Sequence, residues 1–78
     1  MQTNQNQTEQ PATRLDDVLP LETFQKKHSD RFTMPQLLWL LRNRERNGLT
    51  ESGSVLIVSR KFYLVESRFT EWFIRQSA

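Results

Sequence analysis

The chain has 78 residues, a formal net charge of +2 and no cysteine. This length accommodates one small domain, and the absence of cysteine excludes a disulfide framework and thiolate metal ligation. No apolar run approaches the roughly 18 residues that a membrane-spanning helix needs, and the first ten residues lack the basic and apolar regions of a secretory signal. We therefore expect a cytoplasmic protein.

Basic charge is concentrated in the middle of the chain. Residues 31–61 contain six bases and two acids, a local charge of +4, whereas residues 14–30 contain three bases and four acids, a local charge of −1. Such a patch favours contact with phosphate more strongly than the total charge suggests. A solvated helix face would show the same charge pattern, so both interpretations stay open.

The first 13 residues are almost entirely polar. They bury too little apolar surface to offset the entropy of ordering, so we expect residues 1–13 to be a disordered tail and residues 14–78 to be one domain. The aliphatic residues of segment 14–20 are spaced as in a turn of helix that folds onto the core, and Pro20 interrupts or starts a helix. Residues 21–28 form a short predicted helix with Phe24 facing inward.

The central element is a helix predicted over residues 33–46. Thr33 is a favourable N-cap, and Gln36 three residues later completes a capping box. Asn47 and Gly48 provide the left-handed conformation that commonly follows a helix. A short helix, a tight turn and a longer helix are typical of a helix-turn-helix.

This helix has two different faces at about 100° per residue. The apolar face, expected against the core, consists of Met34, Leu37, Leu38 and Leu41, with Leu40 at its edge. The opposite face carries Gln36, Trp39, Asn43 and Arg46, flanked by Arg42. Amide side chains pair with adenine and guanidinium groups pair with guanine in the major groove. We therefore predict that this second face binds double-stranded DNA.

Trp39 has three interpretations on the sequence alone. Its indole can stack on a sugar or a thymine methyl group, it can anchor a protein partner, or segment 14–20 can cover it.

Residues 49–54 form a predicted loop, and residues 55–65 form a predicted β-hairpin. Its two strands are residues 55–58 and 61–65, where Phe62 and Leu64 share one face. The turn between them lacks the Asn-Gly or Asp-Gly signature. Arg60 and Lys61 lie at its tip, where they would contact the DNA backbone or minor groove as a wing.

The last predicted helix spans residues 66–76, with an inward stripe of Val65, Phe69, Trp72 and Phe73. The expected fold is therefore mainly α with a small β-hairpin: a winged helix-turn-helix made of a helix-turn-helix, a two-stranded wing and a C-terminal helix.

Catalytic groups are not evident in this sequence. It has one histidine, His28, two glycines and no glycine-rich phosphate loop. The adjacent Asp16 and Asp17 have no partner base, and no nucleophile and base can be paired. We expect no enzymatic activity, no cofactor, no metal site and no small-molecule substrate.

Two motifs resemble the small winged helix-turn-helix proteins of the phage excisionase and prophage-regulator type. They are residues 58–64, VSRKFYL, followed by residues 69–73, FTEWF; residues 32–49 look like the turn and DNA-binding helix of that family. The resemblance covers residues 21–76. It departs at Ser59, where glycine is usual, and in a longer, leucine-rich helix.

This resemblance implies a protein that bends DNA for excision or controls a prophage or plasmid promoter, without catalytic residues. Its implied partners are double-stranded DNA and, on DNA, a second copy or a recombinase. Two alternatives remain: a protein-interaction module that uses the Trp39 face, and RNA binding, against which the absence of paired exposed aromatic residues on strands counts.

Overall fold

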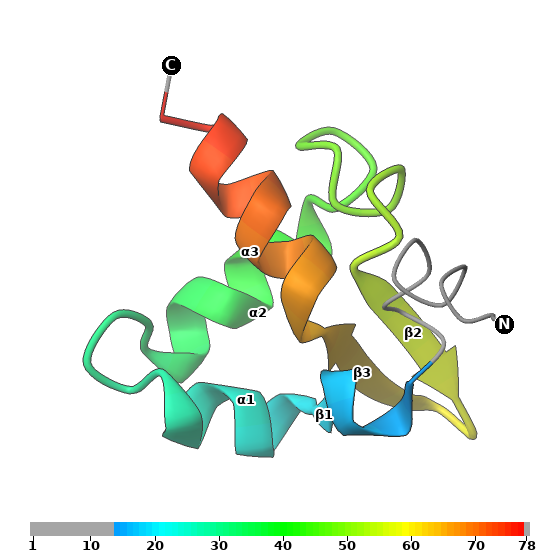
Figure 1. Ribbon diagram of the computed structural model, residues 1–78. Coiled ribbons are helices and arrows are strands. Elements are labelled where there is room, and N and C mark those ends of the chain that lie inside the picture. Colours follow the sequence, from blue (N-terminus) through cyan, green and yellow to red (C-terminus); the bar gives the residue numbers. More distant parts are fainter. Residues whose placement is uncertain (1–13, 78) are drawn as a thin grey trace, which may run out of the picture.

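The computed structural model describes residues 14–77, which form three helices and a three-stranded antiparallel sheet in a mixed α/β arrangement (Figure 1). The helices are α1 (Leu21–Lys27), α2 (Met34–Arg42) and α3 (Glu66–Arg75). The strands are β1 (Val18–Pro20), β2 (Val55–Val58) and β3 (Lys61–Val65), in the sheet order β1-β3-β2. The tail predicted over residues 1–13 lies outside the described residues.

The predicted hairpin is confirmed. Strands β2 and β3 pair from Val55 opposite Leu64 to Val58 opposite Lys61. Ser59 and Arg60 connect them with φ angles of 52° and 67°. Positive φ at both central residues is the mark of a type I′ turn, whose twist matches that of the flanking strands. A Ser-Arg pair thus adopts the backbone that usually selects Asn-Gly.

The prediction of a helical turn over residues 14–20 is only partly correct. Residues 15–17 form one turn of 3-10 helix, but residues 18–20 form strand β1, which pairs with β3 through Val18 opposite Val65. A strand of three residues has no alternation of its own, so its conformation depends on this distant partner. The fold is accordingly mixed α/β rather than mainly α. Pro20 is tolerated because β1 is an edge strand.

The start of α2 is formed as predicted. The backbone N–H of Gln36 donates to the hydroxyl of Thr33 (3.2 Å), and the backbone N–H of Thr33 donates to the Gln36 side-chain oxygen (2.8 Å). Thr33 and Gln36 therefore form a complete capping box. The predicted end is wrong, because the helix stops at Arg42 and residues 43–46 form a turn.

Side chains that bind the last carbonyls of α2 explain the early stop. The Asn43 amide donates to the carbonyl of residue 39 (2.9 Å), the Asn47 amide to that of residue 40 (3.1 Å), and the Arg44 guanidinium to that of residue 41 (2.7 Å). The Asn47 and Arg44 side chains take the places of the backbone N–H groups that a continued helix would offer to residues 40 and 41. The carbonyl of residue 39 keeps the backbone N–H of Asn43 (3.1 Å) as well as its amide, and Arg44 adds a cation at the negative helix end. Gly48 adopts positive φ as expected, but after the turn.

The core lies between the helices and one face of the sheet and consists of Phe24, Leu37, Leu41, Leu49, Leu64, Val65, Phe69 and Trp72. Leu49, from the predicted loop, is fully buried. The Trp72 indole N–H donates to the backbone oxygen of Asn47 (2.8 Å), which satisfies its polar atom.

Two residues expected in the core are exposed. Leu38 is 42% exposed: Leu37 and Leu41 are the fully buried residues of α2, and Leu40 rather than Leu38 packs against them at the edge of the core. Phe73 is 47% exposed: its ring meets the ring of Phe32 edge-on at 5.2 Å between centroids, and the remainder is uncovered.

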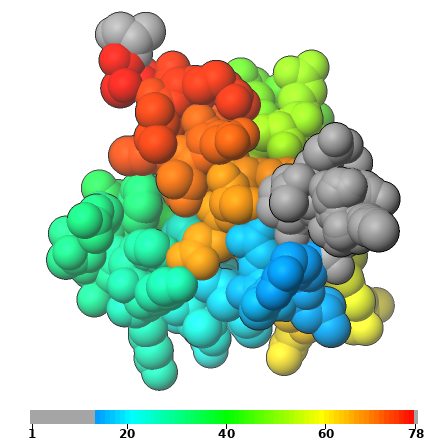
Figure 2. Space-filling view, viewed as in Figure 1, coloured from blue at the N-terminus to red at the C-terminus, as the bar shows by residue number. Residues whose placement is uncertain are grey.

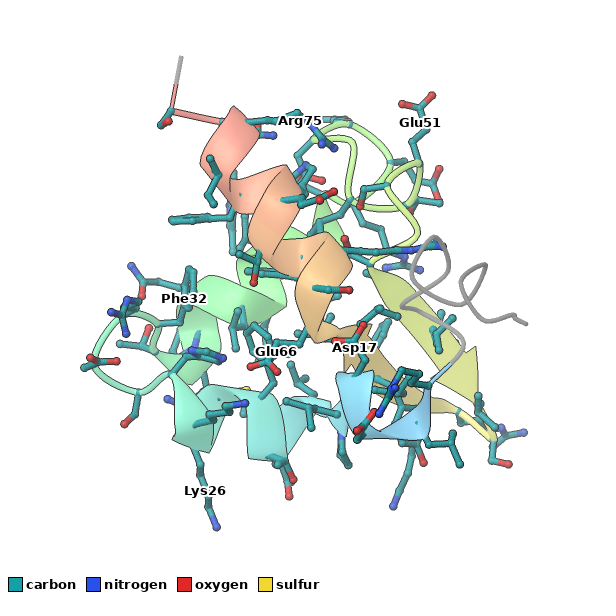
Figure 3. All side chains as sticks on the ribbon, viewed as in Figure 1. Asp17, Lys26, Phe32, Glu51, Glu66 and Arg75 are labelled. Atoms are coloured by element: carbon teal, nitrogen blue, oxygen red, sulfur yellow. The ribbon has the colours of Figure 1, made fainter. Side chains whose placement is uncertain are left out.

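The start of α3 is held by acidic side chains, as Figure 3 shows for Asp17 and Glu66. The Asp17 carboxylate accepts hydrogen bonds from the backbone N–H of Ser67 (2.9 Å) and from its hydroxyl (2.5 Å). It therefore caps a helix 50 positions later and sits at the positive end of the helix dipole.

We expect Asp17→Ala to lower the free energy of unfolding by about 1–2 kcal/mol, the usual effect of losing a helix cap. Asp16→Ala is the matched control, because Asp16 is exposed and its ion-pair partner within residues 14–77 is the equally exposed Arg14, so solvent screens the pair. Urea denaturation followed by circular dichroism measures both. Equal losses in the two variants would contradict the capping role.

Candidate nucleic-acid interface

The structure leaves most of the predicted interface open to solvent. Six of the seven predicted DNA-binding residues are exposed, and the seventh, Asn43, is half-buried at the end of α2. The exposed six are Gln36, Trp39, Arg42, Arg46, Arg60 and Lys61. No other part of the described chain covers the outward face of α2.

The two predicted amides are already engaged within the helix. The side-chain oxygen of Gln36 accepts the backbone N–H of Thr33, and the side-chain nitrogen of Asn43 donates to the carbonyl of Trp39. Bidentate pairing with adenine requires both the oxygen and the nitrogen of an amide. The amides are therefore less available for base contacts than the sequence indicates, whereas the guanidinium groups of Arg42 and Arg46 are not tied up in this way.

The cations of this surface have no ion-pair partners. Within residues 14–77, the basic side chains in ion pairs are Arg14, Lys27, His28 and Arg31. Arg42, Arg46, Arg60 and Lys61 make no ion pair with any described residue, and all four are exposed. Lys26 and Arg75 are likewise exposed and unpaired among the described residues, so the predicted contact residues are four of the six basic side chains there that are free to meet an external anion.

Arg44 connects the two basic segments, a role that the sequence does not reveal. Its guanidinium lies over the ring of Phe62 at 5.4 Å from the centroid, while it also donates to the last turn of α2. Phe62 directly follows Lys61 in β3. This cation–π contact holds the turn after α2 against the start of β3, so residues 42–46 and 60–61 belong to neighbouring parts of the surface.

Trp39 is 57% exposed and borders a shallow groove of about 350 Å³ together with Phe32 and Phe73. Two elements that line this groove are visible in Figure 2: the C-terminal half of α3, which contributes Phe73, and the segment between α1 and α2, which contributes Phe32. Residues 18–20 pair with β3 instead of packing on Trp39. The interpretation that segment 14–20 covers the indole is therefore wrong, and contact with DNA or with a protein remains.

A second cluster of charges has a structural role. Glu66 binds Lys27 (3.0 Å to one carboxylate oxygen) and His28 (2.8 Å to the other), which attaches α1 to the start of α3. Burial alone would raise the pKa of Glu66. Hydrogen bonds and positive charge from Lys27 and His28 lower this pKa by more than burial raises it, so it lies below its ordinary value of 4.5.

Residues 14–77 contain no group of three or more acidic, histidine or cysteine side chains placed to hold a metal ion. No helix in the same part of the chain is both long enough and apolar enough to cross a membrane.

Comparison with protein-family models, with curated proteins and with solved structures finds no match to this chain. The resemblance to the excisionase and prophage-regulator type therefore stays a prediction from the two motifs.

We expect the Glu66 ion pairs to make stability fall with acid. Because the folded-state pKa of Glu66 lies below the unfolded value, its contribution is complete above about pH 4.5 and is lost as the pH falls through the folded pKa. Glu66→Gln should be less stable than the parent at neutral pH, by up to about 1 kcal/mol, and the difference should shrink in acid.

Glu71→Gln is the matched control, since Glu71 is exposed on the same helix and forms no ion pair with a described residue. Urea midpoints measured across the acid range give the comparison. A Glu66→Gln deficit that stays constant with pH would show that the ion pairs are not its cause.

Proposed function

We propose that this protein binds double-stranded DNA as a winged helix-turn-helix of the excisionase or prophage-regulator type. In this arrangement α2 enters the major groove and the β2–β3 hairpin acts as the wing. The observation that carries the proposal is that four of the six exposed, unpaired bases of residues 14–77 lie on these two elements and the turn that follows α2: one ends α2, one lies in the turn after it, one in the hairpin turn and one at the start of β3. They are Arg42, Arg46, Arg60 and Lys61.

Phosphate contact is the main energetic role of these bases. Each neutralised phosphate releases condensed counterions and makes binding depend on salt. Because these cations have no acidic neighbour bound to them, contact with DNA requires no internal ion pair to break. Four such contacts give a single copy modest affinity that weakens steeply with salt.

Base selection then rests mainly on Trp39 and Arg46. Arg46 is exposed in the turn after α2, and its guanidinium can pair with guanine. Gln36 and Asn43 take part through the amide atoms that their internal hydrogen bonds leave over. Such a small base-contacting set favours use of more than one copy on a DNA site, whether the result is promoter control or DNA bending for recombination.

Charge removal at the hairpin turn tests the wing. The double variant Arg60→Gln and Lys61→Gln should bind every duplex more weakly, and the slope of log K against log salt should become shallower by about two, near 0.9 per lost contact. Fluorescence anisotropy with a labelled random duplex at several salt concentrations measures this slope.

The control removes the same charge elsewhere. Lys26→Gln with Arg75→Gln changes the net charge equally, but these residues lie on the outer side of α1 and at the end of α3 (Figure 3). We expect only a small change in slope for the control. Equal slopes for the two double variants would show that the hairpin has no specific contact with DNA.

A protein-interaction module is the second candidate function, and the exposed Trp39 beside the groove favours it. Aromatic residues are frequent anchors of protein interfaces, and the groove is lined by the apolar residues Phe32, Leu40 and Phe73. This surface shares Gln36 and Trp39 with the proposed DNA-binding face and extends from there to Phe73 of α3. One experiment on the labelled protein can separate the two functions, because the hairpin turn belongs to the DNA-binding surface alone.

Amide chemical shifts during a titration with random duplex at low salt provide that experiment. DNA binding should shift resonances of α2, of residues 42–46 and of the hairpin turn, in proportion to the DNA added. Shifts limited to Trp39, Phe73 and their neighbours, or shifts there that change with protein concentration before DNA is added, would favour the interaction module and contradict DNA binding through α2.

A further inference from the structure

One edge of the sheet carries an apolar strand that is not covered. Within residues 14–77, β2 pairs only with β3, so its outer edge is open. Its residues Leu56, Ile57 and Val58 are between 39% and 54% exposed, and the strand contains neither a charged residue nor proline. Natural proteins usually place charged residues or proline on such edge strands, because an unprotected edge pairs with another strand.

The direction of the backbone groups follows from the pairing with β3. The N–H of Val65 donates to the carbonyl of Ser54, so Ser54 belongs to the set that faces β3. Alternation along an antiparallel strand then places Leu56 and Val58 in the same set, whereas the N–H and C=O groups of Val55 and Ile57 point outward. Four backbone groups are therefore available at the open edge.

The opposite edge of the same sheet is protected. Strand β1 has only three residues, ends in Pro20 and follows Asp16 and Asp17. Short length, proline and nearby charge are the devices that prevent edge pairing. If copies pair only through β2, two copies form a closed dimer, and no open edge is left to which a third copy could add.

We propose that β2 is a self-association surface, which pairs antiparallel with β2 of a second copy of this chain. The register that uses all four outward groups on each copy places Val55 of one chain opposite Ile57 of the other. Leu56 then lies opposite Leu56 on the two-fold axis. The two sheets join into one six-stranded sheet with the order β1-β3-β2-β2-β3-β1.

Charge complementarity supports the antiparallel direction. Exposed Glu51 lies in the loop before β2, at the end of the strand away from the turn that carries Arg60 and Lys61 (Figure 3). Antiparallel pairing brings the basic turn of one copy to the end of β2 where the partner's Glu51 lies. A parallel pair would instead place the two basic turns side by side, where like charges repel.

The contact is small, since each copy contributes four strand residues. Interfaces of this size are weak, and their partners exchange between free and bound forms. The dimer is therefore expected to form at high protein concentration and to dissociate on dilution. Because it forms without DNA, it stands or fails separately from the proposed function.

Disulfide trapping tests the register directly, because the chain has no cysteine of its own. In the proposed dimer the two Leu56 Cα atoms face each other at about 4.5 Å, within disulfide range. Oxidation of Leu56→Cys should give a covalent dimer on a non-reducing gel. Val58→Cys is the matched control: Val58 is more exposed than Leu56, but its two copies lie about 13 Å apart, too far to bridge.

Sedimentation equilibrium of the unmodified protein without DNA completes the test. We expect mass to rise with concentration towards that of a dimer, and Leu56→Lys to remain monomeric because it places like charges face to face. A parent protein that stays monomeric at every concentration would overturn the proposal, as would equal cross-linking at positions 56 and 58. Dimerisation that Leu56→Lys leaves intact would also overturn it and would point to the Trp39 groove.

Discussion

The register of β1 against β3 constrains the position of two helices. Val18 lies opposite Val65, and each strand continues into a helix without a connecting loop: β1 into α1 and β3 into α3. Because the strands are antiparallel, the two helices start from opposite ends of this pair. The same register brings Asp17 beside Ser67, so one pairing both orients α3 and supplies its cap. A shift of β1 by one residue would turn Leu19, which lies opposite Leu64 and packs against the core, to the other face and would separate Asp17 from the helix.

The sequence predicted an element correctly where that element is determined by residues close to one another in the chain. The start of α2 follows from Thr33 and Gln36, three residues apart, and the hairpin follows from the alternation of residues 55–65. Strand β1 was not predictable in this way, since its conformation comes from a partner more than 40 positions away. The end of α2 was missed because several side chains compete for its last carbonyls, and periodicity contains no information on that competition.

In the candidate interface, too, some features were predictable from the sequence and others were not. Exposure of Arg42, Arg46 and the hairpin turn was predictable from charge and from the width of an amphipathic helix. The use of Gln36 and Asn43 in internal hydrogen bonds was not, although the capping box predicted from the sequence already required the Gln36 side chain. One side chain cannot offer the same oxygen to its own helix and to a base. Assignment of an amide to base contact should therefore exclude the oxygen that a capping box uses.

The conformation of Arg60 links backbone strain to the proposed contact. A left-handed conformation at a residue other than glycine, asparagine or aspartate is unfavourable by about 1 kcal/mol or more, and Arg60 has a φ of 67°. Glycine at this position would relieve the strain in the turn but would remove a cation from its tip. The flanking strands hold this conformation through their pairing from Val55 to Val58. The turn geometry directs the Arg60 side chain away from the sheet and into solvent. The proposed contact of its guanidinium with a phosphate is a physical reason for arginine, rather than glycine, at this position.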